Sequence, residues 1–439
     1  MERTQKYANR LSAMIQSETV STPNQTDISK FYAFHTLLKR EFPLLFSTCK
    51  VEDFSGSLVL RWQGKASENP VCFMNHMDVV EATGNWRYPP FQGEIAEGKL
   101  WGRGALDTKG GLFAMLQSAE ELIKEGFIPA QDIYFVSTRT EEVGGAHAQI
   151  IVEEFLKRNI RFSFVLDEGG MIVTEPMKGA QGNYAMVGVG EKGYANIKFT
   201  ARGKGGHASA PGKNTPLVRL GCFMAAVEKR SPFQTYLSPT VSETFSVIGK
   251  GMKKGPVKFL LTHNRAFRSI LKRVMPAVSP QGAAMLRTTL AFTMASGSNG
   301  ANVLPEEAYV IADMRYSHHQ GLEGSVAAVK KVAEKYGVET EVLNPGVSSS
   351  LTDYASPAFA LVSEGIQKVF PQTAIVPYLM TAASDSRFFS ALSDSCLRFS
   401  PFVIDNAQLG SVHGADENVN VDNLAPAVDF YKFVMQTFS

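Results

Sequence analysis

Side chains that can bind metal ions follow several apolar stretches of this sequence. Three apolar runs each lead into such side chains: 71–75 into His76 and Asp78, 133–137 into Glu141 and Glu142, and 162–166 into Asp167 and Glu168. A glycine-rich turn at 104–111 adds Asp107. Imidazole and carboxylate groups are ligands for zinc and similar divalent ions.

Each of these features has an ordinary explanation when it stands alone. A His-x-Asp pair is usually a hydrogen-bonded surface pair, and adjacent glutamates usually begin a solvated helix or turn. The glycine-rich turn lacks the spacing of a phosphate-binding loop. Taken together, the three carboxylate positions and one histidine exceed what a single tetrahedral ion needs. They favour two ions that share a bridging carboxylate.

The elements around these residues predict an α/β fold. Apolar strands alternate with amphipathic helices up to about residue 190, which favours a mostly parallel central sheet. Such sheets build their sites at the carboxyl ends of the strands. From residue 193 the pattern approaches β-α-β-β-α-β, the ferredoxin-like arrangement, and the α/β pattern returns near residue 355. We therefore expect a discontinuous catalytic domain (1–192 and 346–439) and an inserted α+β lid or dimerisation domain (193–345).

Residues 250–287 do not fit the ferredoxin-like pattern. They are basic and helical in pattern, and we interpret them as an insertion in the second domain. A helix that lies on a membrane surface is the alternative interpretation.

Nine motifs in this order resemble the two-zinc metallopeptidases that include aminoacylase, carboxypeptidase G, carnosine dipeptidase and succinyl-diaminopimelate desuccinylase. The strongest likeness is to the branch of carboxypeptidase S and the N-acyl-amino-acid hydrolases. The motifs are NHMDVV (75–80), WGRGALDTKGG (101–111), TRTEEVGG (138–145), FVLDEGG (164–170), GKGGHASAP (203–211), GANVLPEEA (300–308), DMRYS (313–317), ASDSRFF (383–389) and SVHGADENV (411–419).

The resemblance implies a role for each matching residue of the first domain. The metal ligands would be His76 and Asp167 at one zinc ion, His413 and Glu142 at the other, and Asp107 bridging both. We prefer Asp167 to Glu168 because it ends the apolar run directly. Glu141 would be the general base, and Asp78 would orient His76. Thr108 stands where many relatives carry Asp, Asn or Met, after a peptide bond that is typically cis in the family.

The resemblance also implies roles for residues of the inserted domain. His207 would stabilise the oxyanion, often from the partner subunit of a homodimer. Asn302 and Arg315 would hold the carboxylate of the substrate, because a guanidinium binds a carboxylate in bidentate fashion. Arg387 is a weaker candidate for the same task, and a structural salt bridge explains it equally well.

The predicted activity is hydrolysis of an amide bond next to a free amino-acid carboxylate. The substrate would be a peptide or an N-acyl amino acid, and the cofactor two zinc ions, with cobalt or manganese as substitutes. The alternatives are a two-metal aminopeptidase and a relative that has lost catalysis. Lys and Arg number 44 against 42 Asp and Glu, so nucleic acid is not an expected partner. We expect no membrane insertion and, from four scattered cysteines and no signal peptide, a cytoplasmic location.

Overall fold

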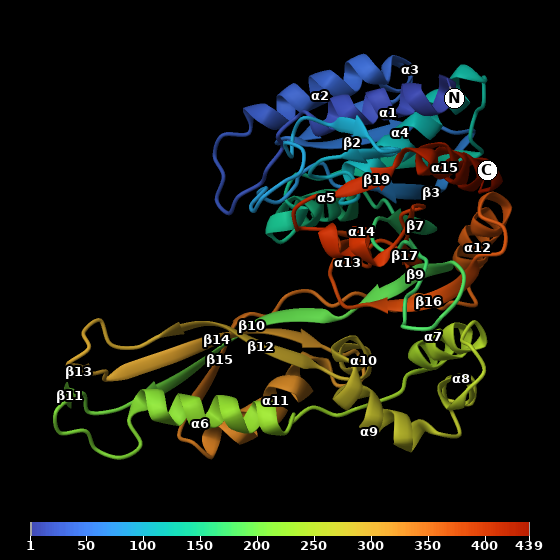
Figure 1. The fold of residues 1–439 in the computed structure, drawn as a ribbon. Helices are drawn as coiled ribbons and strands as arrows, with labels where there is room; N and C mark the ends of the chain where they lie inside the picture. The colour runs from blue at the N-terminus through green and yellow to red at the C-terminus, as the bar shows by residue number, and fades with distance from the viewer. Residues whose placement is uncertain (1, 439) are drawn as a thin grey trace.

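The computed structural model describes residues 2–438, apart from the side chain of Val278. Its main body is a large mixed sheet covered by helices on both faces (Figure 1). The sheet has the order β1-β2-β6-β3-β7-β17-β9-β8-β18, and β16 also pairs with β9. Its strands are β1 (Lys50–Phe54), β2 (Ser57–Trp62), β3 (Ala66–Met74), β6 (Gln131–Ser137), β7 (Phe164–Asp167), β8 (Ile172–Val173), β9 (Tyr184–Glu191), β16 (Ala374–Met380), β17 (Cys396–Arg398) and β18 (Val403–Ile404).

The centre of this sheet is parallel, as predicted. The neighbours β6, β3, β7 and β17 all run the same way. Alternate side chains of β3 enter different cores: Phe73 belongs to one buried cluster, and Cys72 and Met74 belong to another. This period of two places apolar side chains on both faces, so the strand must be covered twice.

Helices supply that double cover. One face packs against α1 (Glu2–Ile15), α4 (Lys109–Lys124) and α15 (Leu424–Thr437), and the other against α5 (Ala146–Lys157) and α13 (Ser386–Phe389). The remaining helices and strands of the first body are α2 (Ser29–Glu41), α3 (Pro43–Thr48), β4 (Glu94–Ala96), β5 (Lys99–Trp101), η1 (Glu141–Val143), α12 (Pro357–Val369), α14 (Asn406–Ser411), β19 (Asn418–Asn420) and η2 (Val421–Asn423).

A second, antiparallel sheet projects from this body (Figure 1). Its order is β12-β14-β10-β15, and α6 and α11 pack against it. In chain order the elements are β10 (Gly193–Arg202), α6 (Pro216–Lys229), β12 (Thr289–Ser296), β14 (Glu307–Tyr316), α11 (Gly321–Glu334) and β15 (Glu339–Asn344), with the short pair β11 (Gly206–His207) and β13 (Val303–Leu304) at the tip. This is the predicted β-α-β-β-α-β arrangement.

Residues 239–286, which include most of the segment that we predicted as an insertion, form α7 (Pro239–Lys250), α8 (Pro256–Thr262), α9 (Arg268–Val278) and α10 (Pro280–Leu286). We expected 250–287 to belong to the inserted domain. Instead Phe245, Leu261 and Leu271 share a buried cluster with the large sheet, and the second sheet has a core of its own. The apolar side chains of these helices pack in the core of the large sheet. A helical pattern in the sequence shows that one face is buried, but not against which sheet. The domain boundaries at 192/193 and 345/346 stay a prediction.

Two further features bear on the environment of the chain. Every helix within residues 2–438 is too short or too polar to cross a bilayer. All four cysteines have free thiols; Cys222 is exposed and the other three are buried.

Candidate metal centre

The predicted metal ligands follow neighbouring parallel strands. His76 comes after β3, the pair Glu141 and Glu142 after β6, and Asp167 and Glu168 at the end of β7. Asp107 precedes α4, and His413 follows α14. Because parallel neighbours end at the same edge of a sheet, these side chains converge there.

Asp107 lies between two histidines. Its Oδ1 is 3.0 Å from His76 Nε2, and its Oδ2 is 3.0 Å from His413 Nε2. Glu142 Oε2 is also 3.0 Å from His413 Nε2. Ligand atoms of His76, Asp107 and Glu142 all lie within 4.8 Å of one another. The peptide bond from Asp107 to Thr108 is cis, as the resemblance implied.

The hydrogen bonds of His76 fix which ring nitrogen faces Asp107. His76 Nδ1 lies 2.9 Å from the backbone carbonyl of Asp78, so the N–H at Nδ1 donates to that oxygen. The Nε2 lone pair then points at a carboxylate oxygen, an arrangement that requires a proton or a metal cation between them. Burial by itself would lower the pKa of His76, but the contacts with Asp107 and Asp78 raise it well above its ordinary value.

The electrostatics of the other ligands also indicate a cation site. Hydrogen bonds to Asp107 and Glu142 raise the pKa of His413 to about 10. Burial raises the pKa of Glu142 despite its contact with His413, and Glu142 Oε1 is buried without a hydrogen-bond partner among the described residues. Closely spaced carboxylates that lack donors are stabilised by divalent ions, so the residues fit metal binding.

Asp78 contacts His76 mainly through its backbone. Its carboxylate Oδ1 is 3.4 Å from His76 Nδ1, farther than its carbonyl oxygen. The carboxylate accepts hydrogen bonds from the backbone N–H groups of Glu141 and Glu142 at 3.3 and 3.2 Å, and from the Ser21 hydroxyl at 2.6 Å. Asp78 therefore holds the turn that carries both glutamates as well as His76.

Asp167 and Glu168 have different surroundings at the end of β7, and our preference for Asp167 over Glu168 stays a prediction. The two oxygens of Asp167 accept the backbone N–H groups of Glu168 at 2.9 Å and Ser386 at 2.8 Å. Burial raises the pKa of Glu168 well above its ordinary value, and the charge of Asp107 raises it further while that of His76 opposes the shift. Glu168 therefore stays a competitor of Asp167 for the metal ligand at the end of β7.

Glu141 stands beside this cluster. Its Oε2 is 4.0 Å from His76 Nε2, and its Oε1 is 4.0 Å from Arg387 Nη1. Burial raises the pKa of Glu141 well above its ordinary value. Arg387 also donates to the backbone carbonyls of Ser384 at 2.8 Å and Gly144 at 3.0 Å. Arg387 thus ties the loop of Glu141 to the turn before α13.

The three predicted residues of the inserted domain are not gathered at the metal centre. His207 is exposed on β11, and the backbone carbonyl of Asn302 accepts the N–H of Ala208 at 2.9 Å, so these two residues meet at the tip of the second sheet (Figure 1). Arg315 lies at the other end of β14, where it pairs with Asp313 at 3.0 Å and stacks on Tyr194.

Sequence reasoning missed one residue that shapes the centre. The buried Glu417 carboxylate accepts the backbone N–H groups of Leu106 at 2.8 Å and Asp107 at 3.0 Å, and it pairs with buried Arg103 at 2.7 Å. Arg103 and Glu417 both lie inside motifs that we recognised, but a single sequence gives no sign that they pair.

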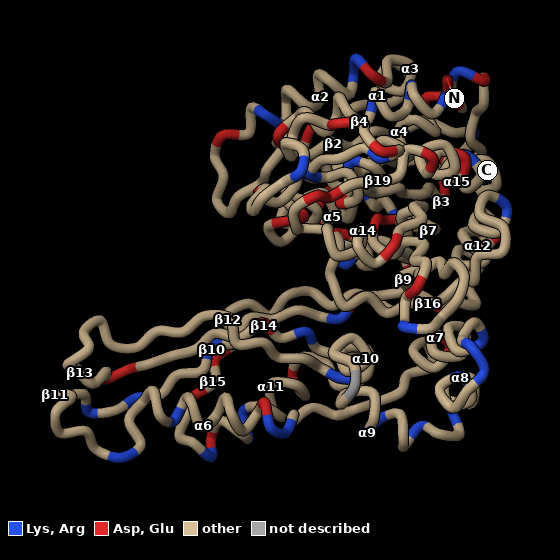
Figure 2. The backbone as a smooth tube through the Cα atoms, in the orientation of Figure 1, with Lys and Arg blue, Asp and Glu red and all other residues tan. Residues whose placement is uncertain are grey.

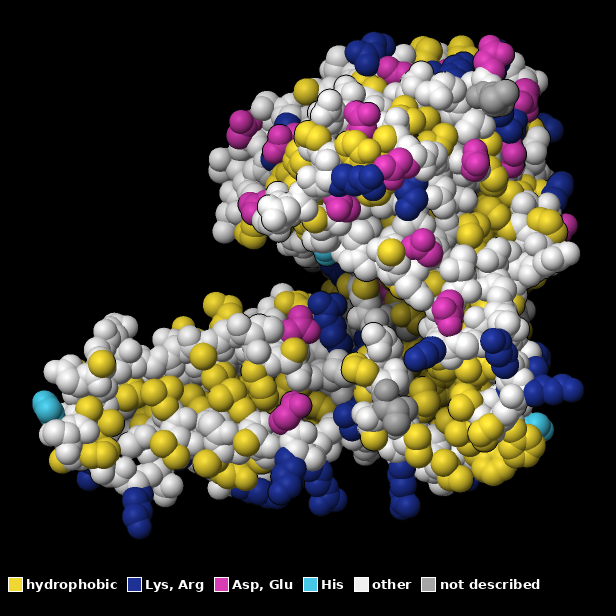
Figure 3. All heavy atoms as spheres, viewed as in Figure 1, with side chains coloured by type: hydrophobic (Ala, Val, Ile, Leu, Met, Phe, Trp, Pro, Cys, Tyr) yellow, Lys and Arg dark blue, Asp and Glu magenta, His cyan; other side chains and the backbone are white. Residues whose placement is uncertain are grey.

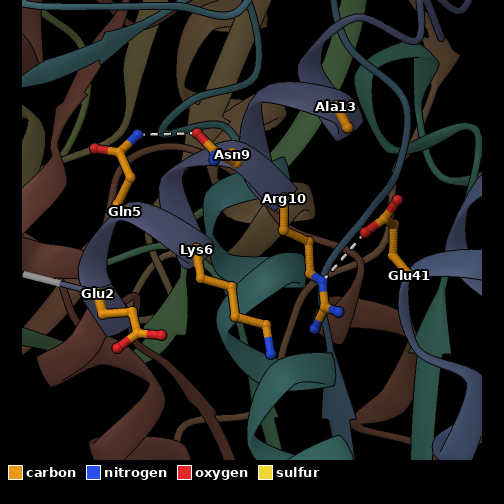
Figure 4. A pocket seen from close by; sticks show the side chains of 7 residues that line it. All are labelled: Glu2, Gln5, Lys6, Asn9, Arg10, Ala13 and Glu41. Atoms are coloured by element: carbon orange, nitrogen blue, oxygen red, sulfur yellow. Dashed lines mark hydrogen bonds and ion pairs between the residues drawn. The ribbon is translucent and has the colours of Figure 1, made fainter.

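A surface hollow elsewhere on the first body carries none of these residues. It lies along α1 and is closed on one side by Glu41 of α2 (Figure 4). Most of its side chains are exposed amides and charges, and the half-buried Arg10 and Glu41 form an ion pair at 3.3 Å.

Comparisons with known proteins cover most of this chain. The model of Peptidase family M20/M25/M40 matches residues 72–437. The chain is 32% identical to a probable carboxypeptidase S-like protein of Dictyostelium discoideum, over 97% of this chain and 84% of that one. It is 27% identical to a human N-fatty-acyl-amino acid synthase/hydrolase, over 96% and 85% of the two chains.

Solved structures show the same fold. An M20 family metallo-carboxypeptidase of Sulfolobus solfataricus superposes with a TM-score of 0.74 at 15% identity, covering 98% of this chain and 99% of that one. Human carnosine dipeptidase 1 gives a TM-score of 0.69 at 14% identity, covering 99% and 96%. The chain is therefore a metal-dependent amide hydrolase and belongs to Peptidase family M20/M25/M40.

Proposed function

We propose that this enzyme releases an amino acid with a free carboxylate from a peptide or an N-acyl amino acid, with two zinc ions as its cofactor. The observation that carries the proposal is the position of Asp107, whose two oxygens each face a different histidine at 3.0 Å. His76 with Asp167, or with its competitor Glu168, would hold one ion, and His413 with Glu142 the other. When bound, the ions would lower the pKa of water and polarise the scissile carbonyl.

Glu141 would be the general base in this reaction. Its carboxylate lies 4.0 Å from the ligand nitrogen of His76 without being a ligand itself. It would take the proton from the attacking water and pass it to the leaving nitrogen. Asp78 would hold Glu141 and Glu142 at fixed positions through their backbone N–H groups.

His207 would donate a hydrogen bond to the oxyanion. The backbone N–H of Ser209 lies 3.1 Å from His207 Nδ1, so Nδ1 is an acceptor and the proton of the neutral ring lies on Nε2. An exposed Nε2–H is a suitable donor. Asn302 beside it, and Arg315 or Arg387, would bind the substrate carboxylate.

A homodimer would bring His207 to a second copy of the metal centre. The tip of the inserted sheet is distant from its own centre in Figure 1. β12 is an edge strand, and Met294 on it is 61% exposed. Exposed edges with apolar side chains are surfaces on which subunits pair. The free thiols would suit a cytoplasmic location.

The acyl side of the substrate divides two candidate activities. The likeness to a relative named as a carboxypeptidase supports peptide substrates for this chain. The likeness to a relative named as an N-fatty-acyl-amino acid synthase/hydrolase supports substrates with long acyl chains. The basic and apolar residues 250–287 could form an acyl pocket, which would favour N-fatty-acyl substrates. The acyl-pocket proposal is tested by measuring turnover of N-acyl amino acids with acyl chains of increasing length, and of short dipeptides for comparison. A rise of kcat/KM with chain length supports the acyl-amino-acid activity, and equal turnover of short dipeptides and long-chain substrates contradicts it.

The two alternative functions make different predictions in the same assay. An aminopeptidase would require a free amino group on the substrate and would ignore N-acylated ones. A relative that has lost catalysis would bind metal and hydrolyse nothing in the panel.

A further inference from the structure

Residues 250–287, which we call the basic segment, carry an unusual concentration of charge. The segment has nine Lys and Arg residues and no Asp or Glu, whereas the whole chain has a net charge of +2. The rest of the chain is therefore negative, at −7. Acidic residues are absent from 244 through 305. A local positive field on a negative protein selects anionic partners.

The apolar side chains of the basic segment divide into two sets. Leu261, Leu271 and Met275 are buried and anchor α8 and α9 to the core of the first body. A second set points outward: Val257 is 50% exposed, Phe259 55%, Ile270 49% and Val274 42%. Figure 3 shows hydrophobic side chains gathered at this end of the molecule, with Lys and Arg projecting around them.

The helix α9 shows the same division along its length. Ile270 and Val274 are four residues apart, so they share one face, while Leu271 and Met275 share the buried face. Arg268 and Arg273 are exposed on the same helix. An outward apolar face bordered by cations is the pattern of helices that lie in a lipid interface.

The cations of the basic segment have no acidic partners. Among the described residues, no salt bridge includes a Lys or Arg from this segment, and ion pairs such as Arg202 with Glu307 lie elsewhere. The Lys258 ammonium donates to the backbone carbonyls of Lys250 and Met252, and Lys253 and Lys254 are exposed beside it. Figure 2 shows blue without red along α8 and α9. Their charge is available to an external partner.

We propose that α8 and α9 dock this enzyme on an anionic lipid surface, with Phe259, Ile270 and Val274 entering the interface and the surrounding cations meeting lipid headgroups. A second copy of the chain is a poor occupant, because a symmetric contact would place two acid-free basic faces together. Bilayers with anionic lipid combine negative charge and apolar depth, as this surface requires. The inference concerns location on a membrane surface and is independent of the reaction.

The charge contribution is tested with the full-length protein and sedimenting vesicles of phosphatidylcholine, with or without about one-third phosphatidylserine. The protein should sediment with the anionic vesicles only, and less at high salt. Replacing Lys253, Lys254 and Arg273 by Gln should weaken binding about 100-fold, at roughly fivefold per charge. The matched control replaces Lys330, Lys331 and Lys335, exposed on or beside α11, and should leave binding unchanged.

The apolar contribution has its own matched pair. Phe259→Ser with Ile270→Ser should weaken vesicle binding by about tenfold or more, because apolar groups leave the interface. Ile150→Ser with Leu156→Ser on α5, where exposure is 49% and 46%, should not weaken vesicle binding.

Three results would overturn the proposal: no binding to anionic vesicles, equal binding to neutral vesicles, or an equal loss of binding in a control variant. So would a dimer in sedimentation velocity that only the Phe259/Ile270 variant loses, because the face would then join two copies.

Discussion

The Glu417 carboxylate accepts the backbone N–H of Asp107 at 3.0 Å, although 310 residues separate them in the chain. It also accepts the N–H of Leu106 and pairs with Arg103, and both partners of that ion pair are fully buried. The turn that carries the bridging carboxylate is thus held from the C-terminal part of the chain.

Replacing Glu417 by Gln should destabilise the protein and loosen the metal centre. The side-chain NH2 group of the glutamine would face the backbone N–H groups of Leu106 and Asp107, which are themselves donors. Arg103 would also lose its buried counter-charge, and breaking a buried ion pair costs about 3–5 kcal/mol of stability. Chemical denaturation measures this loss, and chelator competition should show weaker metal binding. Glu97→Gln at the exposed Arg87 pair is the control and should cost less than about 1 kcal/mol. Equal losses in both variants would contradict the structural role of Glu417.

The choice between Asp167 and Glu168 can be decided by metal content. If Glu168 is the ligand, Glu168→Gln should reduce the bound metal from about two ions to about one per chain, because one donor set is incomplete. Asp167→Asn should keep the metal and lose stability, because its amide would meet the N–H of Glu168 or Ser386. Elemental analysis with thermal denaturation separates the two outcomes, and the reverse result restores Asp167 as the ligand.

His207 should affect the rate without affecting metal binding. Loss of an oxyanion donor costs about 100- to 1,000-fold in kcat, so His207→Ala should show this loss with normal metal content. Mixing His207→Ala with an inactive Glu141→Gln partner should restore activity if the histidine acts across a dimer. Ser209→Ala is the milder control, because the backbone N–H of residue 209 still fixes the tautomer. Unchanged kcat in His207→Ala would remove this residue from the reaction.

Lys192 should make stability depend on pH. Burial lowers the pKa of Lys192 to about 7, with Arg315 and Arg287 adding to the effect. Between about pH 7 and pH 10.5 the unfolded chain binds a proton at Lys192 that the folded chain does not. The free energy of unfolding should therefore rise with pH across this window, and below about pH 7 the folded state should bear the full cost of burying the charged ammonium. Lys192→Met should remove that slope. Unfolding curves at several pH values measure it, and an unchanged slope in the variant would refute the assignment.

The sequence predicted the elements of the fold better than their assembly. The apolar runs 71–75 and 133–137 predicted β3 and β6, because short apolar runs that end in polar turns are typical of buried strands. Residues 250–287 were expected in the inserted domain, since amphipathic helices show that one face is buried but not against which sheet.

The candidate site divides in the same way. His76 and Glu141 were predictable because each lies in the turn that follows a strand, and the ends of parallel strands meet. The contact between Glu417 and the Asp107 turn is made by backbone N–H groups, which leave no mark on residue identity. The preference for Asp167 over Glu168 stays a prediction, because the sequence could not show which backbone N–H groups the Asp167 carboxylate accepts.

The central claim is that Glu141 is the base beside a two-ion centre. Metal content and turnover of the wild type and Glu141→Gln, on the best substrate of the panel, test it most directly. The account predicts about two ions in both proteins and a loss of kcat of at least about 100-fold in the variant. A wild type without metal, or a variant that retains its turnover, would contradict it.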